Sequence, residues 1–461
     1  MEFKLLEPLE EKITNNKSRG VIKWIIGIGI TLIALIVCLA VIVYFALLQI
    51  TDRLEEPNLA GLTAPIFAGP TIRNHIAFVG NDSNIWLVSP DGEQIRFLTK
   101  DSRGYRFPTW APDGRYLAFV GPNDDDKTVL YVSPASESNP KIIFDDEKSA
   151  PFYLYWAPDS QTITFLTQES SGLSMRQVSA NRPDNQRILE EGAPFYWVWS
   201  PSGDKLLMHV GGSRALSEKA HISILENQSN AQRIELDTAP GRFQAPAWST
   251  DGSHFFYIAA NENGRESIFK INAETLAQTV VTNLSGFVYF VLSPNNNNIA
   301  YLQIERGNRP PFGNAYVVGT DGKGQKQVTD RLVASMYWSP DGSKLALLTL
   351  ARNNDGSSAK TGGLAAPLRQ KLTLRWWIYH IESGDLEPLI SFNPTTAFLQ
   401  TVPYFDQYHL SLTFWSPDSR YFVITKEDPS GADGTVWVID TTDQTEPRQV
   451  GEGTLAVWSW H

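Results

Sequence analysis

The residues best suited to catalysis or metal binding are scattered along this sequence. Seven histidines occur, at positions 75, 209, 221, 254, 380, 409 and 461, without an H-E-x-x-H motif or a pair at metal-ligand spacing. His209, His254 and His380 fall inside apparent strands, which favours packed or surface imidazoles. Residues 124–126 are three aspartates, but the D-x-D-x-D-G spacing of a calcium loop is absent, which favours a solvated loop. We therefore predict no catalytic residue, no metal site and no cofactor.

The overall composition excludes some classes of function. The chain has 461 residues, and its 39 basic against 50 acidic residues give a net charge of −11, which argues against a nucleic-acid partner. Its single cysteine excludes an intrachain disulfide framework and any multi-cysteine metal site. A hydrophobic content of 42% excludes a wholly disordered chain.

Residues 24–50 carry no charge and are long enough to cross a bilayer, which needs about 20 apolar residues. A cleavable signal peptide has a shorter apolar region, so we predict an uncleaved transmembrane helix in contact with lipid. Basic residues at positions 4, 12, 17, 19 and 23 precede it, and only Arg53 follows closely. Because positive charge stays inside, residues 1–23 are predicted to be a cytoplasmic tail. Residues 51–74 would form a linker and residues 75–461 an extracytoplasmic domain on a single-pass membrane protein.

A repeat of about 45 residues fills that domain. Its signature is W-S/A-P-D-G followed by an apolar run, with a degenerate copy at Leu292 that lacks the tryptophan. The tryptophans of the repeat are Trp110, Trp156, Trp199, Trp248, Trp338, Trp415 and Trp458. Successive copies lie 43 to 49 residues apart, except for 77 residues between Trp338 and Trp415. Aromatic and β-branched enrichment between turn signals predicts four strands per unit and almost no helix.

These units are predicted to close into a ring. The S-P-D-G segments suit tight turns, because proline, aspartate and glycine each match the backbone conformation required. Residues 76–99 resemble a unit without its first strand, and residues 454–460 resemble that strand alone. Joining them leaves no exposed edge and predicts an all-β, eight-bladed propeller of four-stranded antiparallel blades. Seven blades are the alternative, should the unit at Leu292 or Trp415 be miscounted.

At these residues the sequence resembles the TolB-like, or PD40, β-propeller repeats over residues 75–460. Similar repeats occur in the propeller domains of prolyl-oligopeptidase and dipeptidyl-peptidase-type serine hydrolases. The G-x-S-x-G nucleophile motif of their hydrolase domain is absent from this chain. The resemblance therefore implies a non-catalytic platform for an unidentified protein or cell-envelope partner. The alternatives are an accessory propeller of a separately encoded peptidase or hydrolase, and a glycan or small-ligand receptor at the channel mouth.

The meander topology separates two faces of the predicted ring. The S-P-D-G turns share one end of the blades, which we name the tight-turn face; the linker and the last strand also reach this end. Longer connections, at residues 211–220, 305–314, 351–372 and 391–410, share the other end, the long-connection face. If the tryptophan strand is innermost, as the resemblance implies, aromatic residues before it lie near the channel mouth and could bind a ligand. They are Phe107, Tyr153, Tyr196, Trp197, Phe243, Tyr289, Phe290, Tyr404 and Phe405. Packing between blades is the alternative for any single ring.

Overall fold

The computed structural model describes residues 70–461, except residues 171, 193, 213–217, 229–231, 243, 262, 264, 306–310, 352–371, 429–432 and 444. The chain divides into two units, Met1–Gly61 and Leu62–His461, and the described residues belong to the second. The predicted tail, membrane span and most of the linker lie outside them. Within the described ranges, no helix is long and apolar enough to cross a membrane.

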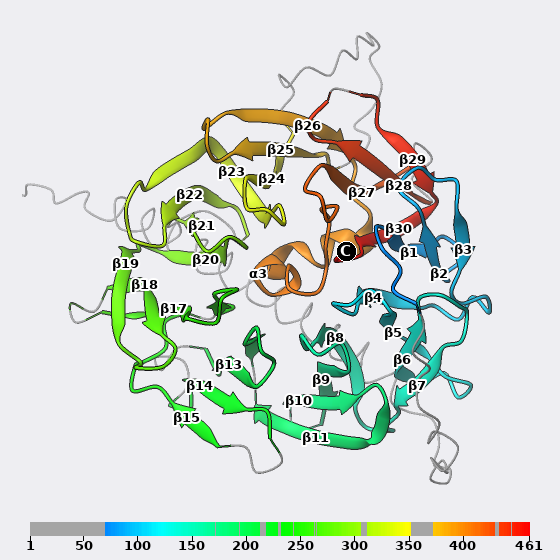
Figure 1. Ribbon diagram of the computed structural model, residues 1–461, viewed down its shortest axis with the longest axis horizontal. Helices are drawn as coiled ribbons and strands as arrows, with labels where there is room; N and C mark the ends of the chain where they lie inside the picture. The colour runs from blue at the N-terminus through cyan, green and yellow to red at the C-terminus, as the bar shows by residue number, and fades with distance from the viewer. Residues whose placement is uncertain are drawn as a thin grey trace, which may run out of the picture. The chain divides into compact units, whose positions relative to one another are not determined.

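The second unit is a ring of small antiparallel sheets (Figure 1). The first sheet contains β1 (Ile76–Gly80), β2 (Ile85–Val88), β3 (Ile95–Phe97) and β30 (Gly453–Trp458). Then follow β4 (Arg106–Trp110), β5 (Tyr116–Pro122), β6 (Thr128–Pro134) and β7 (Lys141–Phe144); β8 (Ala150–Trp156), β9 (Thr162–Glu169), β10 (Gly172–Ser179) and β11 (Arg182–Gly192); β12 (Phe195–Trp199), β13 (Lys205–Val210), β14 (His221–Glu226) and β15 (Arg233–Glu235); and β16 (Ala247–Trp248), β17 (His254–Ala260), β18 (Glu266–Asn272) and β19 (Gln278–Asn283). The predicted all-β class and four-stranded antiparallel units are confirmed.

The remaining strands form two sheets of unusual size. One contains β20 (Phe287–Leu292), β21 (Asn298–Ile304), β22 (Gly313–Gly319), β23 (Lys326–Trp338), β24 (Lys344–Leu350), β25 (Leu374–His380) and β26 (Leu386–Phe392). The other contains β27 (Tyr421–Glu427), β28 (Gly434–Asp440) and β29 (Arg448–Gly451). The start of β23 pairs with β22 and its end with β24, so this one strand serves two blades. Counted this way, the described strands divide into eight units, the number that the repeat predicts.

The first and last described strands close the ring. β1 pairs antiparallel with β30, with Ile76 opposite Trp458. The Ser459 amide also donates to the His75 carbonyl over 2.8 Å, and the Ile72 amide donates to the Gly114 carbonyl over 3.0 Å. The predicted closure is therefore confirmed, and the residues just before β1 lie against a tight turn.

The repeated tryptophans link neighbouring blades by a recurring hydrogen bond. The indole N–H of Trp156 donates to the Thr109 carbonyl over 3.2 Å, one residue before the tryptophan of the preceding blade. The indoles of Trp338 and Trp415 make equivalent bonds of 3.1 Å each, to the carbonyls of Val291 and Tyr337. Other copies depart from this pattern. The buried indole N–H of Trp199 has no hydrogen-bond partner, that of Trp248 donates to the Gly252 carbonyl of its own turn, and that of Trp458 donates to the Asn74 side chain. The tryptophan thus packs against the neighbouring unit and also satisfies a carbonyl there.

Candidate functional site

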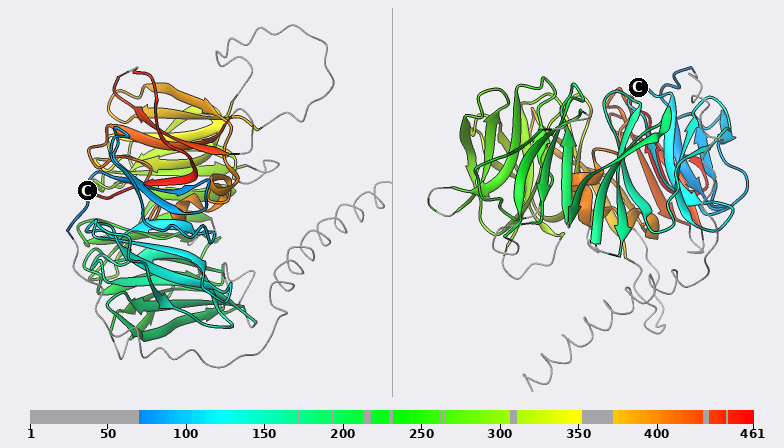
Figure 2. Two further views of the ribbon diagram at one scale, coloured as in Figure 1. Left: turned by 90° about the vertical axis from the view of Figure 1, so that its right-hand side faces the viewer. Right: turned by 90° about the horizontal axis from the view of Figure 1, so that it is seen from below.

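The centre of the ring is occupied by the chain itself. Residues 393–412, which we name the central segment, lie between β26 and β27 and contain α2 (Thr396–Leu399), η2 (Val402–Tyr404) and α3 (Phe405–Tyr408). Figure 1 shows α3 surrounded by the inner strands, and Figure 2 shows this segment toward the side opposite the C-terminus. Phe405 is fully buried and Phe398 is 3% exposed. The sequence predicted a long surface connection here, whereas the structure has a folded element in the middle.

Gln407 attaches the central segment to two blades. Its side-chain oxygen accepts from the Trp197 amide over 3.0 Å, and its side-chain nitrogen donates to the Trp197 carbonyl over 3.0 Å. The same nitrogen donates to the Tyr153 hydroxyl over 2.6 Å, and that hydroxyl donates to the Gln407 carbonyl over 2.9 Å. These groups are buried, so each bond also prevents an unsatisfied polar atom in the interior.

Further contacts reach most of the other inner strands. Thr109 donates through its hydroxyl to the Ser411 carbonyl over 2.9 Å. The ring of Phe405 lies 5.5 Å from that of Tyr289 and 6.4 Å from that of Tyr337, measured between centroids. At the closing blade, the hydroxyl of Thr395 donates to a carbonyl of β30, and so does that of Thr413, directly after the segment. The central segment is therefore held from around the ring.

Two aromatic residues adopt strained backbone conformations toward this segment. Phe107 has φ of 53° and Tyr153 has φ of 46°, a left-handed region unfavourable for bulky side chains. Each lies at a register shift in its inner strand. The Tyr408 ring lies 6.3 Å from the Phe107 ring and 4.9 Å from the Tyr153 ring. These register shifts, or β-bulges, thus orient both aromatic rings toward the central segment.

Asp406 is the most unusual titratable group of the ring. It is fully buried, and its Oδ2 accepts from the Ala245 amide over 3.0 Å. Its Oδ1 has no side-chain or backbone partner of hydrogen-bond geometry. Burial raises the pKa of this carboxyl to about 7, although nearby backbone amides oppose the effect. A buried carboxyl that titrates near neutrality is a functional-site candidate.

A cavity of about 470 Å³ lies on the long-connection face between β11 and the start of β14. The acidic and basic residues that line it are Glu190, Glu191, Glu218, Lys219, His221 and Glu235. Arg233 approaches Glu190, with its Nη1 atom 2.6 Å from the Glu190 Oε2 atom. The lining is predominantly acidic.

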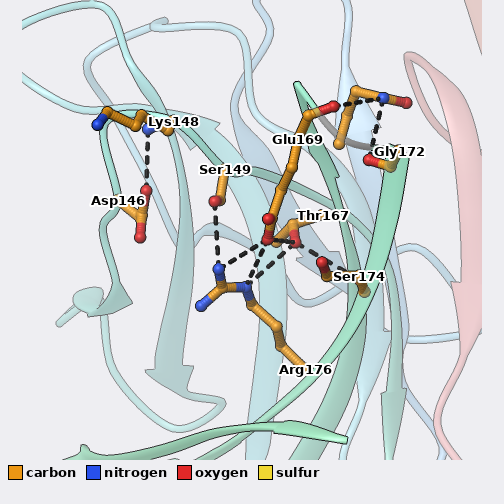
Figure 3. A network of polar contacts seen from close by, with 9 residues as sticks. Asp146, Lys148, Ser149, Thr167, Glu169, Gly172, Ser174 and Arg176 are labelled. Atoms are coloured by element: carbon orange, nitrogen blue, oxygen red, sulfur yellow. Dashed lines mark hydrogen bonds and ion pairs between the residues drawn. The ribbon is translucent and has the colours of Figure 1, made fainter. Parts of the chain in front are cut away.

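In the blade that contains β11, Arg176 organises a polar network (Figure 3). Its Nη2 atom lies 2.7 Å from Glu169 Oε1 and donates to the Ser149 hydroxyl over 3.3 Å. Burial alone would raise the pKa of Glu169, but hydrogen bonds from Arg176 and nearby hydroxyls lower it. Both side chains are largely buried, so this ion pair stabilises the blade. Across the described ranges, no group of three or more histidine, cysteine, aspartate or glutamate residues is placed to hold a metal ion.

The comparisons with known proteins agree with this architecture. The chain is 26% identical over 125 residues to the Tol-Pal system protein TolB of Alcanivorax borkumensis, a stretch that covers 27% of this chain and 28% of that protein. The domain is a TolB-like β-propeller. No family model matches the chain.

Solved structures give a likeness of fold alone. The structure of a putative TolB from Agrobacterium tumefaciens is 18% identical, with a TM-score of 0.38, and the match covers 59% of this chain and 96% of that one. The structure of a eukaryotic initiation factor is 9% identical, with a TM-score of 0.50, and the match covers 84% of this chain and 98% of that one.

In the TolB-like propeller, most of the nine predicted aromatic residues face the interior. Six of them are less than 9% exposed: Tyr153, Tyr196, Trp197, Tyr289, Phe290 and Phe405. Phe107 is half-buried, Tyr404 is 51% exposed, and Phe243 lies outside the described residues. Tyr153, Trp197, Tyr289 and Phe405 meet at the central segment, whereas Phe290 belongs to the packing between blades. For the six buried residues, packing describes the environment better than an open ligand surface does.

Sequence reasoning missed Asp406 and Gln407 altogether. Both lie in the 77-residue interval between Trp338 and Trp415, whose excess length was the available signal. Nothing in their immediate sequence indicates burial in the centre of a ring.

Proposed function

We propose that this chain is a non-catalytic, membrane-anchored, extracytoplasmic propeller that binds a protein or cell-envelope partner. The observation that carries the proposal is the central segment, which occupies the middle of the ring and bonds to its inner strands. A channel already filled by buried side chains favours recognition on the outer faces of the ring.

The long-connection face is the proposed binding surface. It presents the acidic cavity and Tyr404, a residue of the central segment that is 51% exposed. Exposed aromatic residues and polar rims are typical of protein-binding surfaces. The opposite face consists of short turns whose polar groups bond to one another.

The envelope location rests on two supports. The uncharged stretch at residues 24–50 fits a membrane anchor, with more basic residues before it than after it. The matched relative is a Tol-Pal system protein, TolB, which favours an envelope location for this chain as well.

The net charge of −11 opposes nucleic-acid binding.

The test is recovery of a partner with the tagged full-length chain after chemical crosslinking and detergent solubilisation. A double variant, Tyr404→Ala with Glu191→Lys, alters the long-connection face, and Glu93→Lys is the matched charge reversal on the tight-turn face. The proposal expects recovery with the wild type and Glu93→Lys but not with the double variant. Equal recovery with all three chains would overturn the choice of face.

The same experiment separates the alternatives. An accessory propeller of a separate hydrolase predicts co-purifying peptidase or esterase activity. A glycan or small-ligand receptor predicts binding of such a ligand by the purified chain with no protein partner.

A further inference from the structure

The central segment contains an acidic group without a cation beside it. Asp406 is fully buried, and the Ala245 amide donates to its Oδ2 atom over 3.0 Å. The backbone amides of Asp406 and Gln407 also act on this carboxyl and lower its pKa, but less than burial raises it. Among the described residues, no lysine, arginine or histidine forms an ion pair with it. The opposite oxygen, Oδ1, lacks a hydrogen-bond partner.

The groups that face Asp406 from the surrounding elements are neutral. The titratable ones are Tyr196 of β12, Tyr289 of β20, Tyr337 of β23 and His409 of the central segment. Burial raises the pKa of Tyr196, Tyr289 and Tyr337 above the usual value, so none carries charge near neutrality. Burial also lowers the pKa of His409 to about 4, which leaves its imidazole neutral.

A carboxylate in such surroundings is unfavourable. Burying an ionised group without a counter-charge is costly, whereas the protonated acid is tolerated. The site therefore fits the neutral acid.

One strand that holds the central segment is under backbone strain. Tyr153, which exchanges hydrogen bonds with Gln407, has φ of 46°. Strain of this kind persists only where the surroundings enforce it, and it reduces the free-energy difference between the seated and released states.

We propose that protonation of Asp406 holds the central segment in the ring and that ionisation favours its release. The segment would then act as a pH-responsive element of the long-connection face, with Tyr404 moving together with Asp406. This regulatory role for partner binding rests on the proposed function, whereas the movement itself does not.

The direction of the pH effect follows from linkage. The pKa of Asp406 would be about 4 when the central segment is released into solvent, and it is about 7 when the segment lies in the ring. The free-energy difference that keeps the central segment in the ring is therefore largest below about pH 4. It decreases as pH rises to about 7 and changes little above that.

The test is hydrogen exchange of peptides from residues 396–412 in the full chain between pH 5 and pH 8.5, corrected for intrinsic exchange rates. In the wild type, protection should fall about tenfold per pH unit up to about pH 7 and then level off. Asp406→Asn should abolish this fall, whereas Asp251→Asn, a matched change on the tight-turn face, should retain it.

A second variant keeps the result interpretable. Tyr153→Phe removes the hydroxyl bonds to Gln407 and should lower protection by a similar factor at every pH. A wild-type profile without the fall, or the same fall in Asp406→Asn, would overturn the proposal. Because no partner is needed, failure here is distinguishable from failure of the binding function.

Discussion

The tight turns and the central segment use aspartate in opposite ways. In the turn after β16, Asp251 accepts from the Ser249 hydroxyl over 2.6 Å and from the Ser253 amide over 3.0 Å. These bonds lower the pKa of Asp251 to about 2, whereas burial raises the pKa of Asp406 to about 7. The turn carboxylate is stabilised by neighbours in sequence, and the central one depends on groups brought together by the whole ring.

This contrast distinguishes the parts of the fold that depend on contacts close in sequence from those that depend on contacts distant in sequence. The turn carboxylates bond to groups within about five residues, as Asp251 does, so their environment is similar in each blade. The turns also bond to one another, since the amides of Asp113 and Asp341 donate to serine hydroxyls in the turn of the next blade. The central segment has no repeated counterpart, and its bonds span up to 302 residues of sequence between Thr109 and Ser411. Substitutions should therefore have large effects in the centre and small ones in the turns.

The largest expected effect is that of Gln407→Ala. Loss of this side chain leaves the Trp197 amide and carbonyl unsatisfied in the interior, at about 1–3 kcal/mol for each buried group. We expect the free energy of unfolding to fall by about 3 kcal/mol in chemical denaturation. Gln400→Ala, an exposed position of the same segment, is the control, and equal effects would contradict the comparison.

A smaller, pH-dependent effect is expected for Asp406→Asn. Because the folded pKa is raised, the stability that protonation provides is complete below about pH 4 and is lost as pH rises to about 7. This group should contribute a slope of at most about 1.4 kcal/mol per pH unit in that range. The variant should show a flatter curve of unfolding free energy against pH, measured in urea. An unchanged slope would show that Asp406 is not the group responsible.

A moderate effect is expected for Trp338→Phe, because the Val291 carbonyl loses its indole donor. We expect a loss of about 1–2 kcal/mol beyond the change in ring size. Trp199→Phe is the matched control at the equivalent repeat position, since its indole N–H has no partner to lose. The comparison of unfolding free energies measures the link between blades directly, and identical losses would argue that packing alone accounts for the tryptophan.

The smallest effect is expected for Asp251→Asn. Since the folded pKa is lowered, the stability from this carboxylate is present above about pH 4 and is lost as pH falls toward 2. The side chain is exposed, so the loss at neutral pH should stay below about 1 kcal/mol. Thermal unfolding at pH 7 and pH 3 tests this, and a difference between variant and wild type that is as large at pH 3 as at pH 7 would contradict it.

The ring itself could be predicted because its signals are local and repeated. Each W-S/A-P-D-G copy specifies a strand, a turn and the next strand, and the incomplete units at the two ends indicated closure. The sheet shared through β23 was not predicted, because strand continuity across two blades depends on how the backbone bends between Lys326 and Trp338.

The centre could not be predicted in the same way. The sequence placed Tyr153, Trp197 and Tyr289 correctly near the inner strands but did not show what covers them. Their cover, including Phe405 and Gln407, comes from a segment more than a hundred residues away in sequence. Burial of this kind is a property of tertiary packing, and the over-long interval before Trp415 indicated an insertion without indicating its destination.

The pairing of β1 with β30 also sets a condition on biosynthesis. His75 and Ser459 meet across 384 positions of sequence, so the first blade stays incomplete until the last strand has left the ribosome. Such non-local pairing slows folding and leaves strand edges unprotected in the meantime. A nascent chain that stalls before residue 453 would thus display unpaired backbone at both ends, a feature by which chaperones and proteases could distinguish unfinished molecules from finished ones.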